Sequence, residues 1–227
     1  DLSFIQEDIK EQYMDPLTTR EINFLTKHEV VTGDTDRDII IMTYDDGGTE
    51  EELNHIMDLY EQYGLKTTFF VTGVWVERNK ELTASIIDRG FELGCHGWNH
   101  SEMTSLSSIE VYKRLANFLS LIKEISPNYK VSLIRFPYGS RNDRVRRIAA
   151  EFGLQSILWN VESGGVNEST LNNVLNNIGN GSLVLSHSSR PYDVFFTEEI
   201  ISSILSQGYD IVTVSEGMLE EDHYPGN

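Results

Sequence analysis

Two adjacent carboxylates follow an apolar run early in the chain, in the stretch IIIMTYDDGG at residues 39–48. The apolar run predicts a buried strand, which places Asp45 and Asp46 at its carboxyl end. Their like charges repel each other unless a nearby cation offsets the repulsion. Thr49 and Glu52 already form a T-x-x-E capping box for the next helix, so helix capping does not require the aspartates. By itself the pair is a weak signal, because a turn also explains two aspartates, and it gains meaning only beside a second motif.

Two histidines stand four positions apart in HGWNH, residues 96–100, at the end of another β-rich run. If the segment turns helically after the strand, two imidazoles at this spacing reach one metal ion; in an open loop they have no special meaning. Two imidazoles and one carboxylate leave coordination positions open for water and substrate. We therefore expect His96 and His100 to share a divalent cation with one aspartate, while the other aspartate serves as a base.

The elements that must position these residues alternate between β-rich runs and helical patterns. We expect strands at residues 38–45, 66–73, 91–97, 131–138, 155–161, 182–187 and 210–215. Helices are expected at residues 50–63, 79–89, 108–125, 142–152, 170–179 and 197–207. This alternation is typical of parallel βαβ units, and seven strands with six helices favour an α/β barrel over an open sheet.

Sites in parallel α/β folds lie beyond the carboxyl ends of the strands. Besides the two motifs above, Arg135, Pro137 and Tyr138 end the fourth expected strand, and His187 ends the sixth. The other histidines, at positions 28, 55 and 223, fall on predicted helix or tail and are expected at the surface. The candidate site residues thus converge on one end of the fold.

These motifs, in this order, resemble those of the polysaccharide deacetylases, the NodB-type enzymes of carbohydrate esterase family 4, over roughly residues 38–217. TYDDG (43–47) looks like the first motif, and HGWNH (96–100) like the second. The resemblance implies that Asp45 is the catalytic base, and that Asp46, His96 and His100 bind the metal. It also implies a distorted (β/α)7 barrel.

Two further motifs complete the resemblance: RFPYG (135–139) looks like the third, and LSH (185–187) like the last. The resemblance implies that Arg135 orients the base and that the backbone N–H of Tyr138 helps hold the oxyanion. Leu185 would line the acetyl pocket, and His187 would be the general acid. Trp98, near the same end of the barrel, suits a sugar-stacking platform as well as a core or rim position.

The chain departs from the family pattern in two places. Gly97 stands where the second motif usually has Ser or Thr, which removes a hydroxyl that would stiffen the loop and predicts weaker metal binding. The fourth motif normally supplies an Asp followed by Trp, whereas this chain has WNVESGG at 159–165, with Glu162 as its nearest carboxylate. Arg135 is therefore expected to have different partners. Cys95 neighbours His96, but adjacent strand residues face opposite sides, so we expect a buried small hydrophobe rather than a ligand.

Composition bounds the remaining interpretations. The 227 residues carry a formal net charge of −18, which argues against nucleic acid and anionic lipid as partners. No apolar stretch approaches the length of a membrane-spanning helix. We expect an N-terminal helical extension over 1–37, with helices near 3–13 and 18–27, a catalytic domain over 38–217 and an acidic tail over 218–227. The oligomeric state is not predicted.

Three functions fit these observations. The first is metal-dependent removal of acetyl groups from an N- or O-acetylated polysaccharide such as chitin, peptidoglycan or xylan. Zinc is the first choice of metal, with cobalt or nickel suited to the same ligands. The second is a related metal-dependent amidase acting on a non-sugar amide or imide, which the missing fourth-motif Trp motivates. The third is a non-catalytic carbohydrate-binding relative. The resemblance implies secretion or a cell-envelope location, with the cytoplasm as the alternative, although the N-terminus DLSFIQEDIK lacks a signal-peptide pattern.

Overall fold

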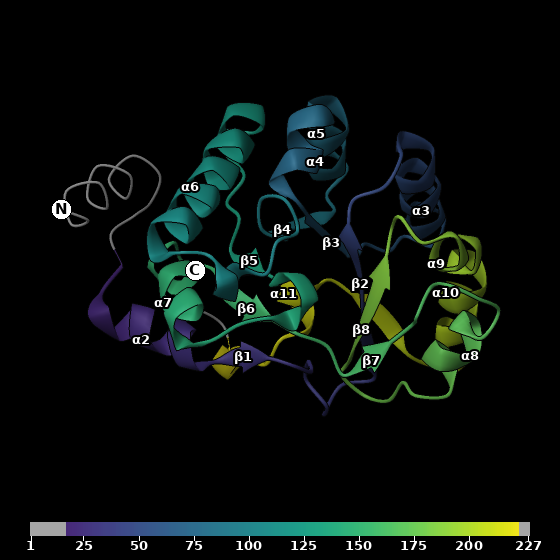
Figure 1. The fold of residues 1–227 in the computed structure, drawn as a ribbon. Coiled ribbons are helices and arrows are strands. Elements are labelled where there is room, and N and C mark those ends of the chain that lie inside the picture. The colour runs from purple at the N-terminus through teal and green to yellow at the C-terminus, as the bar shows by residue number, and fades with distance from the viewer. Residues whose placement is uncertain (1–16, 223–227) are drawn as a thin grey trace.

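A computed structural model describes residues 17–222 and consists of strands alternating with helices (Figure 1). The strands are β1 Glu29–Val30, β2 Ile39–Asp46, β3 Thr68–Val71, β4 Glu92–Cys95, β5 Leu133–Ile134, β6 Gln155–Ile157, β7 Val161–Glu162, β8 Ser182–His187 and β9 Asp210–Val212. The helices are α2 Thr19–Lys27, α3 Glu50–Gln62, α4 Gly73–Arg78, α5 Lys80–Asp88, α6 Ser108–Ile125, α7 Asp143–Glu151, α8 Thr170–Leu175, α9 Pro191–Phe195, α10 Thr197–Ser206 and α11 Val214–Gly217. Short 3-10 turns span Met103–Ser105, Pro137–Gly139 and Glu220–Asp222.

The strands form one parallel sheet in the order β1-β6-β5-β4-β3-β2-β8-β7. β9 pairs with the first half of β2, and β3 pairs with the second half of β2. Because β8 occupies the other edge of β2, β9 and β3 lie along the same edge of that strand. The parallel α/β class expected from the sequence is confirmed. The sheet is curled but open, because its two outer strands, β1 and β7, do not pair with each other within residues 17–222.

The strand expected over 155–161 is two strands, and this difference explains how the barrel is distorted. β6 pairs near one edge of the sheet and β7 forms the other edge. The three residues between them, 158–160, therefore cross the opening of the curl. Leu158 N–H donates to the Val30 carbonyl on one side, and Asn160 N–H donates to the Leu183 carbonyl on the other. A backbone link thus bridges a gap that strand pairing leaves open.

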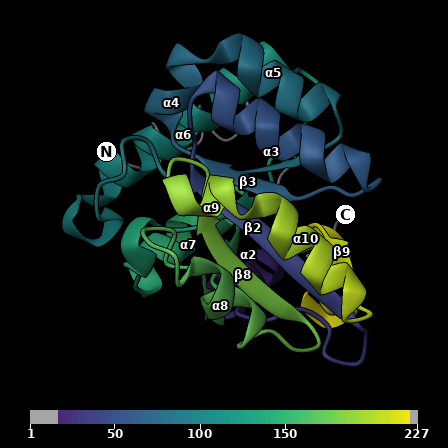
Figure 2. The same cartoon turned by 90° about the vertical axis from the view of Figure 1, so that its right-hand side faces the viewer.

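Alternate residues of β2 face two different apolar clusters. Ile40, Met42 and Tyr44 belong to the large core between the sheet and the surrounding helices. Ile41 belongs to a smaller cluster inside the curl, which also contains Val214 of α11. Figure 2 shows α3 and α10 side by side on the outer face, next to β2 and β8. The inward set continues through position 45, so the first aspartate enters the curl.

Four expected strands are shorter in the structure, and each loses residues to a turn or helix that follows it; the strand over 91–97, for example, ends at Cys95, before the turn at 97–99. The strand over 66–73 ends at Val71, because Thr72 caps α4. The strand over 131–138 is reduced to β5, and its last residues form the 3-10 turn at 137–139. The strand over 210–215 ends at Val212, because Thr213 caps α11 with a capping box. The capping box at Thr49 and the bounds of α6 and β8 agree with the sequence expectations.

The described part of the N-terminal segment is joined to the sheet. α2 packs against α7, and β1 extends the sheet beyond β6. The helix expected near 3–13 lies outside the described residues, and the proposed domain boundaries at 37 and 217 stay predictions. Between residues 17 and 222, no helix has the length and apolar character needed to cross a bilayer.

Candidate metal centre and catalytic site

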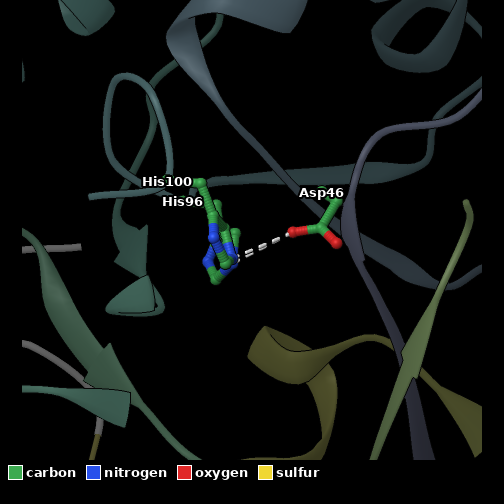
Figure 3. Close-up of side chains that lie close together, drawn as sticks. All are labelled: Asp46, His96 and His100. Atoms are coloured by element: carbon green, nitrogen blue, oxygen red, sulfur yellow. Dashed lines mark ion pairs between the residues drawn. The ribbon is translucent and has the colours of Figure 1, made fainter. Parts of the chain in front are cut away.

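Asp46, His96 and His100 meet at the carboxyl ends of β2 and β4 (Figure 3). Asp46 Oδ1 lies 3.5 Å from His96 Nε2 and 3.2 Å from His100 Nε2. One ligand atom from each side chain falls within 4.8 Å of the other two. The structure therefore brings together the three residues that the sequence marks as metal ligands. In Figure 3 both imidazoles point toward the carboxylate.

The backbone at this centre is unusual. The three non-glycine residues with positive φ in the described chain are Asp46 (78°), His100 (57°) and Tyr138 (60°). Such conformations cost free energy and persist where the surroundings impose them, often at functional sites. HGWNH forms a turn and not a helical segment, because the chain passes through left-handed conformations at Gly97 (φ 73°) and His100. That turn, and not helical spacing, sets the two imidazoles side by side.

The residues present fit a divalent cation. His96 Nδ1 donates to the Arg135 carbonyl at 2.8 Å, which fixes the tautomer and leaves Nε2 free as a ligand atom. Asp46 Oδ1 is buried and accepts no hydrogen bond. A buried carboxylate oxygen without a donor, facing two imidazole nitrogens, is chemically unsatisfied by protein alone. A cation coordinated by these atoms would satisfy it, and the donor set suits zinc.

The electrostatics of the three candidate ligands are coupled. Burial raises the pKa of Asp46, but the interaction with His96 and the charges of His96, His100 and His187 outweigh it, so the pKa is lowered. Burial lowers the pKa of His100, and His96 lowers it further. Burial also lowers the pKa of His96, yet the two aspartates outweigh it and the pKa is raised. His100 therefore favours the neutral state that a metal ligand requires.

Asp45 is held separately from the ligand group by Arg135. Asp45 is 3% exposed and Arg135 is fully buried. Arg135 Nη1 donates to Asp45 Oδ1 at 2.7 Å and to Thr43 Oγ1 at 2.7 Å, and its guanidinium lies over the Phe70 ring. The other carboxylate oxygen, Oδ2, lies 3.7 Å from His96 Nε2. Asp45 thus has one oxygen fixed by a buried ion pair and the other directed toward the candidate metal centre.

The fourth-motif departure has a structural counterpart at Arg135. Glu162 is exposed and does not pair with Arg135. Instead, Arg135 Nη2 donates to the Leu158 carbonyl at 2.9 Å, while its Nε is buried without a partner. The guanidinium therefore donates hydrogen bonds to two groups other than Asp45. These are the Leu158 carbonyl, in the link between β6 and β7, and the hydroxyl of Thr43. The sequence analysis predicted neither partner. For the carbonyl the reason is that any residue type can supply it.

His187 enters the same region from β8. The register of β2 and β8 pairs Asp45 with His187. Burial lowers the pKa of His187 to about 4. Asp193 of α9, which the sequence did not single out, is buried, accepts the His187 backbone N–H at 2.8 Å and lies 3.9 Å from His187 Nδ1. Burial raises the pKa of Asp193 to about 6.

The remaining predicted site residues flank this centre. Tyr138 is 67% exposed, and its ring lies edge-on against His100 with centroids 4.5 Å apart. Leu185 is buried on β8, two residues before His187 and therefore on the same face of that strand. Trp98 is partly buried and lies against Gly73 at the start of α4. The roles assigned to these three residues stay predictions.

Gly47 and Gly48 have a structural explanation. Gly47 has φ 91°, and a Cβ there would lie 2.6 Å from the Trp75 ring. Trp75 Nε1 donates to the Gly48 carbonyl at 2.8 Å. The tryptophan therefore packs on the backbone directly after the two aspartates. Cys95 is fully buried in the large apolar core, which confirms the expectation for that residue.

The fold and the site together define a parallel α/β half-barrel with a candidate metal centre and a separate carboxylate at the strand ends. A family model described as polysaccharide deacetylase matches residues 32–157. The chain belongs to the polysaccharide deacetylase family. The family implies a hydrolase acting on acetylated glycans and is generally metal-dependent, and the resemblance drawn from the motifs is confirmed.

Similar proteins extend this family assignment. The peptidoglycan-N-acetylmuramic acid deacetylase PdaC of Bacillus subtilis is 32% identical over 96% of this chain and 48% of PdaC, so the chain spans about half of that relative. The peptidoglycan-N-acetylglucosamine deacetylase of Bacillus cereus is 33% identical over 78% of this chain and 87% of that protein. A solved structure of a CE4 family pseudoenzyme from Bacillus anthracis has a TM-score of 0.80 at 27% identity, over 85% of this chain and 69% of that one.

Proposed function

We propose that this protein removes acetyl groups from an acetylated cell-envelope polysaccharide, with peptidoglycan as the first candidate. The observation that carries the proposal is the arrangement of two neighbouring aspartates with different partners. Asp46 faces His96 and His100, whereas Asp45 is paired with Arg135 at 2.7 Å. One carboxylate is thus available to a cation and the other to a proton. Both relatives described above carry names that specify peptidoglycan deacetylation.

Asp46, His96 and His100 would hold the cation, for which zinc is the first choice and cobalt or nickel suit the same donors. When bound, such a cation supplies Lewis acidity that activates water and polarises an acetyl carbonyl. Asp45 Oδ2 accepts the proton of the attacking water, while Arg135 keeps Oδ1 fixed and so aims the carboxylate. The ion pair is dry and rigid, which suits a base that must keep one orientation.

β8, the strand that pairs with β2, supplies the residue for the second proton transfer. His187 protonates the leaving amine or alkoxide, so that acetate and the deacetylated sugar separate. The backbone N–H of Tyr138 would stabilise the oxyanion, and Leu185 would contact the acetyl methyl group. Trp98 would stack on a sugar ring. Secretion or attachment at the cell envelope follows from this choice of substrate.

The test combines elemental analysis of untreated protein with acetate release from a substrate panel. The panel contains peptidoglycan, N-acetylglucosamine oligomers, acetylxylan and small non-sugar amides. We expect about one equivalent of divalent metal, acetate release from a glycan, and loss of both after exhaustive chelation. Turnover only of the small amides would favour the amidase alternative. Saccharide binding without metal or turnover would favour a non-catalytic relative, a class to which the Bacillus anthracis neighbour belongs by its description.

A further inference from the structure

Asp193 and His187 form a buried pair that the motifs do not account for. Asp193 is 1% exposed, and its Oδ2 accepts the backbone N–H of His187 at 2.8 Å. The same oxygen lies 3.9 Å from His187 Nδ1. The carboxylate is therefore tied to the backbone of the residue whose ring it faces. This arrangement holds the distance between the two side chains within narrow limits.

The two facing atoms are sealed from solvent. His187 Nδ1 and Asp193 Oδ1 are buried and have no hydrogen-bond partner, and the same holds for Ser163 Oγ, while Asp193 Oδ2 is the carboxylate oxygen nearest Nδ1. Buried polar atoms without partners are uncommon in proteins. A small rotation of the imidazole would bring Nδ1–H within hydrogen-bond range of Asp193. Nε2 is then the ring nitrogen through which His187 exchanges a proton with a substrate.

The loop after β7 is shaped around this carboxylate. Gly165 has φ 63°, and a Cβ there would overlap Asp193 Oδ2. Ser163 is fully buried in the same loop, and Arg190 Nη1 donates to the Gly164 carbonyl at 2.7 Å. The loop backbone therefore approaches the carboxylate as closely as glycine permits. Asp193 therefore lies between the loop that follows β7 and the helix that follows β8. This enclosure favours a single position of its carboxylate.

We propose that Asp193 is a positioning residue for proton transfer by His187, its carboxylate holding the Nδ1 proton so that Nε2 carries the proton given to the leaving group. The proposal rests on the function proposed above. When Nε2 donates its proton to the departing nitrogen or oxygen, the neutral ring keeps the proton on Nδ1 and Asp193 Oδ2 accepts that hydrogen bond. Nε2 first takes this proton from solvent, which forms the imidazolium, and the proton that Asp45 accepts from the attacking water is returned to solvent. The hydrolysis of the acyl bond is otherwise unchanged.

The electrostatics support this assignment. Burial lowers the pKa of His187 to about 4 even with Asp45 and Asp46 nearby, so the resting ring is neutral near neutral pH and carries a single N–H. Burial raises the pKa of Asp193 to about 6, which still leaves it ionised at neutral pH. An adjacent carboxylate favours the imidazolium that the transfer requires. The titratable and charged groups that face the pair are Tyr44, Asp45, Asp46, His96, Glu162 and Arg190.

The test is Asp193→Asn, which keeps an oxygen for the His187 N–H but removes the charge. We expect kcat for N-acetylglucosamine oligomers to fall about 10–100-fold with KM within about twofold, a typical loss for impaired acid catalysis. Hydrolysis of 4-nitrophenyl acetate, whose leaving group departs without protonation, is expected to stay within about twofold. Asp34→Asn is the matched control, since Asp34 Oδ1 also accepts a backbone N–H, from Asp36, but in an exposed turn. It should leave both rates unchanged.

A general structural defect would lower both rates equally and would overturn the proposal. So would a further loss from Asp193→Asn in a His187→Ala background, because a positioning residue acts only through its partner. Nitrogen-15 NMR of His187 provides a readout that needs no activity. We expect the Nδ1–H tautomer in the parent protein and a shift toward Nε2–H in Asp193→Asn. An Nε2–H tautomer in the parent overturns the pairing, whereas absence of acetate release with the Nδ1–H tautomer would contradict only the proposed function.

Discussion

The two sides of the candidate site are built in different ways. On the β2 and β4 side, Asp46, His96 and His100 come from two short motifs, and two of the three residues have strained left-handed backbone. On the β8 side, His187 lies at the end of a regular buried strand, and its carboxylate partner comes from a helix that follows. The first side depends on local turns. The second depends on packing between segments.

This difference explains which departures from the family pattern the structure accommodates. The candidate metal side keeps the motif residues, and its change at Gly97 falls at φ 73°, a conformation that glycine adopts without strain. The fourth-motif carboxylate is missing: the Leu158 carbonyl lies beside Arg135, the partner of Asp45, and on the β8 side Asp193 supplies a carboxylate from α9. A site held by local turns needs particular residues in sequence. A site held by packing can take a partner from elsewhere.

The largest expected effect separates the two aspartates of the first side. Asp46→Ala should abolish both metal binding and acetate release, since it removes one of three ligands. Asp45→Asn should retain the metal and lower kcat about 10²–10⁴-fold, because it removes the base but leaves the ligand group intact. Elemental analysis and acetate release on the same preparations measure both quantities.

Asp45→Asn also affects stability, because Asp45 is the ion-pair partner of Arg135. Asp45→Asn leaves a buried guanidinium without its counter-charge, which is expected to cost about 3–5 kcal/mol of unfolding free energy. Urea unfolding therefore has to accompany the activity measurement. A folded Asp45→Asn protein that keeps its metal and its full rate would contradict the role given to Asp45. Equal metal loss in both variants would contradict the division of labour between the aspartates.

The sequence predicted the first side better than the second for a physical reason. Asp45, Asp46, His96 and His100 are titratable residues at strand ends, and strand ends follow from apolar patterning. The turn that joins the two histidines depends on backbone conformations that a spacing of four does not reveal. The sequence therefore left the conformation of this segment open, although the convergence itself was predicted.

The contributors that the sequence analysis missed, the Leu158 carbonyl and Asp193, lack such a signal. The Leu158 carbonyl reaches Arg135 only because β6 and β7 lie near opposite edges of the sheet, which depends on the closure of the whole fold. Asp193 lies in a five-residue helix that is too short for a clear periodic pattern. The fold class could be predicted from alternating elements, but contacts that depend on tertiary closure could not.

A second prediction tests whether the first side is held by close backbone packing. Gly47→Ala should lower the free energy of unfolding by about 2–4 kcal/mol, because it adds a clash with Trp75 to the cost of a left-handed alanine. Gly208→Ala is the matched control, since Gly208 has the same φ of 91° and no atom within 4 Å of the added Cβ. It should cost only about 1 kcal/mol. Urea unfolding curves compare the two, and equal costs would show that Trp75 does not hold the turn.

The smallest expected effect concerns the pH dependence of the second side. Burial lowers the pKa of His187 from 6.5 to about 4, so between these values the unfolded chain binds a proton that the native protein does not. That residue alone makes stability fall as pH falls from 6.5 to 4. Burial raises the pKa of Asp193 from 3.8 to about 6, so there the native protein binds the extra proton. That residue alone makes stability rise as pH falls from 6 to 3.8.

The two contributions have opposite signs and largely cancel in the parent protein. Replacing one partner leaves the contribution of the other uncompensated. Between pH 7 and pH 4.5, Asp193→Asn should lose about 2 kcal/mol of unfolding free energy relative to the parent, and His187→Gln should gain about 2–3 kcal/mol. Urea unfolding with chelator present measures both, because all proteins are then compared without metal. Changes of the same sign in the two variants would show that the pair does not titrate as opposed groups. Opposite changes would show that the unfolding free energy of the β8 side depends on pH through two separable groups. The candidate ligands of the β2 and β4 side are coupled and are not expected to behave in this way.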